Sequence, residues 1–190
     1  MKFNRSIAVL SFLYFLIGCG SSNVGAPADN KLIDGLINKK SFEIVSQSAT
    51  PQNTMAINAV ANSGLLAPGD TSGLINLIGN VNYLRVHGDS ISAYLPFFGE
   101  RRMGVVYGSQ NGGISFDGTP TNYVVKNGKK NAREIRFTIN DEENETEHYR
   151  VLIYMYPNLR TTININSTHR TSMTYRGNAS DHKKQLQLPD

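Results

Sequence analysis

The sequence predicts an all-β domain, either an antiparallel sandwich or a partly closed barrel, preceded by one short helix. Apolar and polar residues alternate with a period of two through most of the chain after residue 41. Turn residues (Gly, Asn and Asp) separate these segments at the spacing of β-hairpins. No rhythm of strands alternating with long helices is found in the sequence, so a parallel α/β fold is not expected.

The first 18 residues are predicted to be a secretory signal. Lys2 and Arg5 precede an apolar run, Ile7–Ile17, that is shorter than the ~20 residues of a membrane-spanning helix. The run ends at Leu16-Ile17-Gly18-Cys19, on the only cysteine of the chain. This stretch resembles the lipobox of bacterial lipoproteins, which implies cleavage before Cys19 and acylation of its thiol.

The lipobox resemblance also predicts a location. Two or more acyl chains hold a protein firmly at a bilayer, because each buried methylene contributes ~0.8 kcal/mol. Gly20 follows the cysteine in place of an acidic residue, which in such lipoproteins implies transfer to the outer membrane. The absence of an acidic run there favours a periplasm-facing position. Residues 19–30 are small and polar and are expected to form a flexible tether.

The folded part is predicted to be one β-rich domain, residues 31–180, with a polar tail at 181–190. A length of about 150 residues suits a single core. Two of the positive charges, Lys2 and Arg5, lie in the signal, so the formal charge of +4 becomes +2 from Cys19 onward. This near balance gives no support for a nucleic-acid partner, and none is predicted.

Most of the domain is predicted to be strands. The exception is Lys31–Lys40, whose apolar residues recur at helical spacing. Met55–Ala61 alternates and is expected to be a strand. Three hairpins are expected: one turning at Gly88-Asp89, one between Met103–Tyr107 and Gly113–Phe116, and one turning at Asn127-Gly128.

The C-terminal half contains the strongest strand signals. The acidic run Asp141–Glu147 is expected to form a solvated hairpin tip. It leads into Tyr149–Tyr156, which is apolar on both faces and is predicted to be a central strand. Thr161–Ile165 and a segment marked by Met173 and Tyr175 are predicted to complete the sheet.

Three motifs recur together in this chain. They are Gly88-Asp89 followed by Tyr94-Leu95-Pro96-Phe97-Phe98-Gly99, then Gly113-Ile114-Ser115-Phe116, and finally Ser167, Arg170, Tyr175 and Gly177. Together they resemble a family of Bacteroidota lipoproteins, the domain of unknown function forty-two fifty-one. The resemblance runs from Phe42 to Gly177 and implies a β-rich periplasmic or surface lipoprotein with no assigned activity. Phe97 stands where that family usually has tyrosine.

The second half of the first motif is a candidate ligand or partner surface. It consists of Tyr94, Pro96, Phe97, Phe98, Gly99, Arg101 and Arg102. One interpretation is structural, because proline ends a strand and an aromatic ring then fills the core. The other is the lip of a binding cleft, in which the two arginines contact an anionic group. Both interpretations remain open from the sequence.

Other chemistry-bearing residues form no recognisable constellation. His87, His148, His169 and His182 lack metal-ligand spacing, so no metal, cofactor or catalytic residue is predicted. Ser90, within Asp89-Ser90-Ile91, resembles a short bacterial O-glycosylation acceptor.

The expected function is therefore that of a non-enzymatic, lipid-anchored protein of the cell envelope. Its acyl chains bind the membrane, and its β-rich domain binds an envelope protein or a small ligand. Two alternatives stay open: an envelope hydrolase with an unrecognised site, which requires two titratable groups within hydrogen-bond reach in a cleft, and a structural accessory of an envelope complex, which requires a broad exposed apolar patch.

Overall fold

A computed structural model describes residues 30–103, 112–144 and 146–182 of the chain. The predicted signal, Cys19 and the tail from residue 183 lie outside these ranges. The described residues form one antiparallel sheet in which nine strands follow the order β5-β4-β3-β1-β10-β9-β8-β7-β6, and the short β2 pairs with β1. No helix of the described residues is long and apolar enough to cross a membrane.

The strands and helices are short and joined mostly by tight turns. Their bounds are α2 (Lys31–Lys39), β1 (Ser41–Pro51), α3 (Met55–Asn62), β2 (Ile75–Asn76), β3 (Tyr83–His87), β4 (Ser90–Leu95), β5 (Ile114–Gly118), β6 (Thr121–Asn127), η2 (Lys129–Asn131), β7 (Arg133–Asn140), β8 (His148–Met155), β9 (Arg160–Ser167) and β10 (Met173–Asp181).

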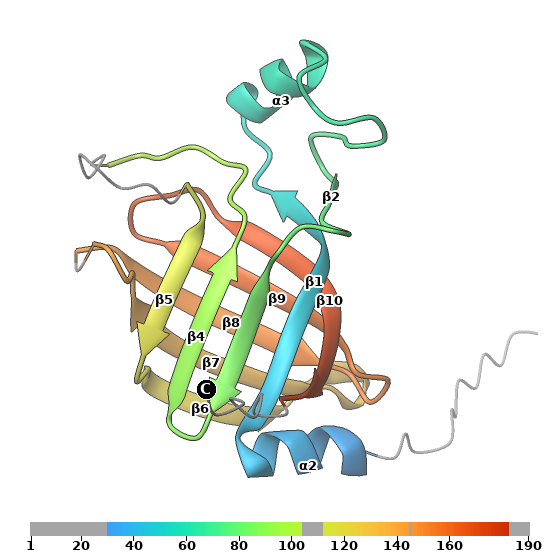
Figure 1. The fold of residues 1–190 in the computed structure, drawn as a ribbon, viewed down its shortest axis with the longest axis vertical. Helices are drawn as coiled ribbons and strands as arrows, with labels where there is room; N and C mark the ends of the chain where they lie inside the picture. Colours follow the sequence, from blue (N-terminus) through green and yellow to red (C-terminus); the bar gives the residue numbers. More distant parts are fainter. Residues whose placement is uncertain (1–29, 104–111, 145, 183–190) are drawn as a thin grey trace, which may run out of the picture.

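The sheet curls into a half-barrel, which agrees with the predicted all-β fold. Figure 1 shows β3, β4 and β5 in front of β6 to β9, with the core between the two halves. The ring of Phe116 on β5 lies 6.3 Å from that of Phe137 on β7 and 5.8 Å from that of Tyr149 on β8. Because alternate residues of each strand face this core, the period of two in the sequence is the pattern of an inner and an outer sheet face.

Helix α2 closes one end of the half-barrel (Figure 1). It buries Ile33, Leu36 and Ile37 against the sheet, as the helical spacing predicted. The helix ends at Lys39, because Lys40 adopts a left-handed conformation with φ of 47°. A fork of two hydrogen bonds, from Nε and an Nη of Arg133 to Asp34 at 2.7 and 2.8 Å, ties α2 to the start of β7.

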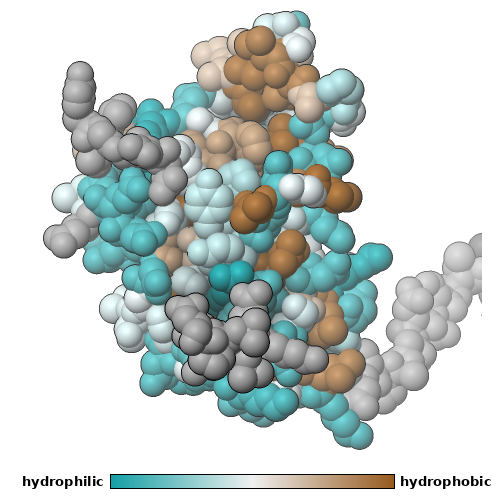
Figure 2. All heavy atoms as spheres, viewed as in Figure 1, coloured by the Kyte–Doolittle hydropathy of each residue, from teal (hydrophilic) through white to brown (hydrophobic). Residues whose placement is uncertain are grey.

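The predicted strand Met55–Ala61 is wrong, because these residues form helix α3. Thr54 caps the helix with its hydroxyl, which accepts from the backbone N–H of Ile57 at 3.4 Å. Alanine favours a helix, and no neighbouring strand is present to pair with this segment. Only Ile57 is buried, while Met55 is 91% exposed, and Figure 2 shows an apolar surface over α3.

Two of the three predicted hairpins are confirmed. Strands β3 and β4 turn at Gly88-Asp89, and β6 and β7 pair around Asn127-Gly128 with η2 in the connection. For the middle hairpin, β5 is a strand as predicted, but in the described residues it pairs with β4. Most of the other predicted arm, residues 104–107, lies outside the described residues. The predicted central strand is β8, which lies between β7 and β9.

Candidate functional site

Residues of the sequence motifs meet at Arg170, which lies between β9 and β10 and is only 3% exposed. Its Nε donates to Glu147 at 2.7 Å, and one of its Nη atoms lies 3.4 Å from Asp141. The other Nη donates to the backbone carbonyl of Gly113, and the guanidinium lies 5.4 Å from the centre of the Phe97 ring. The motifs therefore converge in space on one buried cation.

Around Arg170 the structure assembles a charge-balanced group, here called the Arg170 cluster. It consists of Arg101, Asp141, Glu147, Tyr149 and Arg170. The Tyr149 hydroxyl donates to Asp141, and Arg101 lies 3.7 Å from the second oxygen of Glu147. Two arginines thus face two carboxylates. This balance fits a buried position, since a buried charge without a partner is costly.

The predicted solvated tip at Asp141–Glu147 is wrong at its two ends. Asp141 is 7% exposed and Glu147 is fully buried. Both carboxylates turn inward because Arg170 provides a partner from a distant strand connection, which no local pattern reveals. Residues 142 to 144 are more exposed and resemble the expected tip.

The cluster shifts the acidity of its members. Burial opposes ionisation of Glu147, but hydrogen bonds from Ser167 and Arg170 outweigh it and hold the pKa of Glu147 below its usual range. Burial, followed by the hydrogen bond to Asp141, raises the pKa of Tyr149 far above its usual range. Glu147 is therefore ionised and Tyr149 neutral near pH 7, as the pairing requires.

The predicted surface from Tyr94 to Arg102 divides among several environments. Pro96 follows β4, and its carbonyl accepts from the buried Tyr175 hydroxyl at 2.8 Å. A Cβ at Gly99 would lie 2.2 Å from the hydroxyl of Thr171, so this position has no room for a side chain. Phe98, which with Gly99 lines a small apolar hollow beside α3, does not share the Arg170 environment of Phe97.

The two predicted arginines also separate. Arg101 turns inward to Glu147, whereas Arg102 is exposed and its backbone N–H donates to the carbonyl of His169 at 2.7 Å. Tyr94 lies half-buried on β4. This segment therefore connects β4 to the Arg170 cluster, and the structure does not gather its aromatic and cationic side chains into one cleft.

The histidines and Ser90 occupy unrelated positions. His87 and His182 contact each other edge to face at 6.2 Å, while His148 and His169 lie near opposite ends of β8 and β9 connections. Among the described residues, no group of three His, Cys, Asp or Glu side chains converges as metal ligands would. Ser90 begins β4 and donates to the carbonyl of Gly118 at 3.4 Å.

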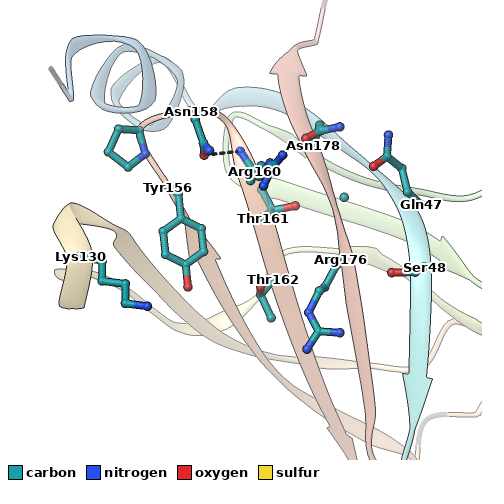
Figure 3. A pocket seen from close by; sticks show the side chains of 12 residues that line it. Gln47, Ser48, Lys130, Tyr156, Asn158, Arg160, Thr161, Thr162, Arg176 and Asn178 are labelled. Atoms are coloured by element: carbon teal, nitrogen blue, oxygen red, sulfur yellow. Dashed lines mark hydrogen bonds between the residues drawn. The ribbon is translucent and has the colours of Figure 1, made fainter. Parts of the chain in front are cut away.

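A hollow that the sequence did not predict lies on the outer face of the sheet. It has a volume of about 810 Å³ and is here called the outer groove. Figure 3 shows Tyr156, Arg160, Thr162 and Arg176 around it, contributed by β9, β10 and the turn after β8. Lys130 reaches it from η2. The described lining contains three cationic side chains and neither a carboxylate nor a histidine.

The local fold explains why this surface is open. Strand β1 has an irregular register between Ser46 and Ser48 where it pairs with β10. A Cβ at Gly177 would lie 2.0 Å from the carbonyl oxygen of Val45, so only glycine fits at this close approach. Thr161, which also lines the groove, has a buried hydroxyl without a hydrogen-bond partner among the described residues.

The chemistry of the outer groove suits an anion. Arg160 and Arg176 are exposed, and among the described residues neither forms an ion pair. Hydroxyl and amide groups of Thr162 and Asn178 lie between them. Sequence reasoning missed these residues because they occupy ordinary polar positions of alternating strands, and only the pairing of β8, β9, β10 and β1 brings them together.

The fold defines the class as an all-β protein with a single curled antiparallel sheet. The model of the DUF4251 family, described as a domain of unknown function, matches residues 28–179. The chain belongs to this family, as its motifs predicted.

A crystal structure of a DUF4251 family protein from Bacteroides eggerthii DSM 20697 has the same fold. It superposes with a TM-score of 0.53 at 15% sequence identity, over 80% of this chain and 87% of that chain. At this identity the likeness concerns the fold alone. No curated protein matches the chain.

Proposed function

We propose that the protein is a non-enzymatic, lipid-anchored binding module of the cell envelope whose outer groove binds an anionic ligand. The observation that carries this proposal is the cationic lining of the outer groove. Arginine forks match carboxylate and phosphate groups, and a hollow of several hundred Å³ is the usual size of a small-ligand site.

The absence of an acid or a histidine from the described groove lining favours binding over hydrolysis. General acid–base catalysis needs a titratable group within hydrogen-bond reach of the substrate. The carboxylates of the Arg170 cluster are buried and already paired with arginines, which suits a structural role.

The groove is tested with the monosaccharide galacturonate and with its neutral counterpart galactose, by NMR shift perturbation of the purified domain. Galacturonate is expected to shift resonances of Thr162 and Asn178, and the double variant Arg160→Gln, Arg176→Gln is expected to weaken binding at least tenfold. The matched control, Lys39→Gln on the distant helix α2, is expected to bind like the wild type. Equal shifts with galactose would contradict an anion site.

The envelope location is tested separately through the predicted anchor. Cys19→Ser is expected to abolish cleavage before residue 19 and acylation, so that the mature protein no longer fractionates with the outer membrane. A Cys19→Ser variant processed at the same bond and still in that fraction would overturn the anchor.

A role as an accessory of an envelope complex is a second candidate, favoured by α3 and the loop after it. From Gln52 to Gly69 the chain has no charged residue, and Met55 and Leu65 are 91% and 77% exposed. Figure 2 shows this apolar surface at the tip of the molecule. A photo-crosslinker at Leu65 is expected to capture one defined neighbour, and the variant Met55→Ser is expected to reduce its capture. A crosslinker at Asp117 serves as the control.

A further inference from the structure

We infer that the outer groove is one part of a longer binding track and that its ligand is a linear acidic polysaccharide. This inference rests on the proposed function and goes further, because it names a polymer that crosses the sheet. The evidence is a second cationic hollow on the same face, the register of the strands between the two, and the polar side chains along the way.

The second hollow, here called the far groove, has a volume of about 500 Å³ and lies over β6, β7, β8 and β9. Its lining includes Lys126, Arg136 and Arg150. Glu134 pairs with Arg136 at 2.6 Å, whereas Arg150 is exposed and forms no ion pair among the described residues. Cations therefore exceed anions here, as they do in the outer groove.

The strand register places the two grooves next to each other. Thr162 of the outer groove pairs directly with Tyr154, and Leu152 of the far groove is the next residue on the same face of β8. In the other direction Thr162 pairs with Arg176 of β10. One cross-strand step and one step along β8 thus separate the two hollows.

The span of the track exceeds a single sugar. Arg136 lies on β7 and Arg176 on β10, three strand spacings apart, which amounts to ~14 Å across the sheet. A monosaccharide cannot contact both arginines at once, whereas a hexasaccharide can. A polymer would therefore gain affinity from the far groove by adding contacts within one chain.

The side chains between the arginines favour a saccharide. Thr174 donates to the amide oxygen of Asn164 at 2.9 Å, and Ser172 donates to that of Asn166 at 2.7 Å. These bonds hold the two carboxamides in place across the face, with an amide NH₂ group on each. Fixed hydroxyl and amide groups match sugar hydroxyls, and the spaced arginines match carboxylates that recur along a chain.

A single-stranded nucleic acid fits this face less well. It carries a phosphate at every nucleotide, and proteins that bind it combine a dense basic groove with exposed aromatic platforms. Here the arginines are separated by neutral Thr and Asn side chains, and the half-buried Tyr154 is the one ring on the path between the grooves.

The experiment compares galacturonate with hexagalacturonate by isothermal titration, using maltohexaose as a neutral chain of the same length. Hexagalacturonate is expected to bind at least tenfold more tightly than galacturonate, and maltohexaose is expected not to bind. The far-groove variant Arg136→Gln, Arg150→Gln is expected to remove the gain from chain length while leaving the affinity for galacturonate unchanged. The outer-groove variant Arg160→Gln, Arg176→Gln is expected to weaken both ligands.

The outcomes separate the two proposals. Equal affinities for galacturonate and hexagalacturonate, or a far-groove variant that keeps the gain, would overturn the track while the outer groove stands as a small-ligand site. Failure of both acidic ligands to bind would overturn the proposed function itself. Tighter binding of oligothymidylate, or of vesicles containing phosphatidylglycerol, than of hexagalacturonate would replace the polysaccharide with that partner.

Discussion

The Arg170 cluster and the outer face of the sheet use arginine in opposite ways. In the cluster, Arg170 is buried and surrounded by two carboxylates, a backbone carbonyl and an aromatic ring. On the outer face, Arg150, Arg160 and Arg176 are exposed, and no described carboxylate pairs with them. The first arrangement is already complete, and the second has binding capacity to spare.

The difference teaches where to look for function in this protein. A buried charge is costly unless its partners are in place, so the fold around Arg170 must hold all of them together. An exposed arginine remains hydrated and contributes little to stability. Substitutions in the two regions should therefore separate stability from binding.

The largest effect is expected for Arg170→Met. It leaves Asp141 and Glu147 buried without their main partner, which should destabilise the domain by about 3–5 kcal/mol. Urea unfolding followed by circular dichroism measures the change. If this variant fails to fold, Arg170→Lys keeps the charge but loses the fork, and it should fold with a smaller loss. A wild-type midpoint in both variants would contradict the structural role.

A smaller effect with a pH signature is expected for Glu147→Gln, about 1–3 kcal/mol at pH 7. The pKa of Glu147 is lower in the folded than in the unfolded chain, whose ordinary value is 4.5, so its ionisation stabilises the fold above that pH. The contribution is lost as the pH falls through the folded pKa. The wild type and the variant should therefore converge in stability below about pH 4.5, while the exposed Asp117→Asn control follows the wild type throughout.

Arg101→Gln should have a weaker effect, because Arg101 is partly exposed and lies 3.7 Å from Glu147. The expected loss is about 1 kcal/mol or less. A double-mutant cycle of Arg101→Gln with Glu147→Gln measures the coupling between them. A coupling as large as that between Arg170 and Glu147 would show that solvent screens this pair less than its exposure implies.

The smallest effect on stability is expected for Arg136→Gln with Arg150→Gln, within about 0.5 kcal/mol. Both side chains are exposed, so their removal leaves no buried group unpaired. Thermal unfolding measures the change. A loss of several kcal/mol here would erase the contrast between the two regions.

Prediction from the sequence succeeded where the signal was local and repeated. The period of two identified the sheet, Gly88-Asp89 and Asn127-Gly128 identified two hairpins, and helical spacing identified α2. It failed at Met55–Ala61, where alternating apolar residues in an alanine-rich segment also fit a helix, and the cap from Thr54 decided the outcome.

The candidate sites depended on pairings that are distant in sequence. The motif residues Gly113, Ser167 and Arg170 could be matched to a family, but their common contact required β5, the β7–β8 turn and the β9–β10 connection to meet. Arg160 and Arg176 gave no signal at all, since an arginine on the polar side of a strand is ordinary.

By itself, the sequence determined the all-β class, the family and the alternation of inner and outer faces, because these follow from turn chemistry and from side chains that alternate along each strand. Only the tertiary structure decided which charges are buried and which remain exposed. That choice depends on register: residues 23 or more positions apart, such as Glu147 and Arg170, become partners only after the sheet has curled.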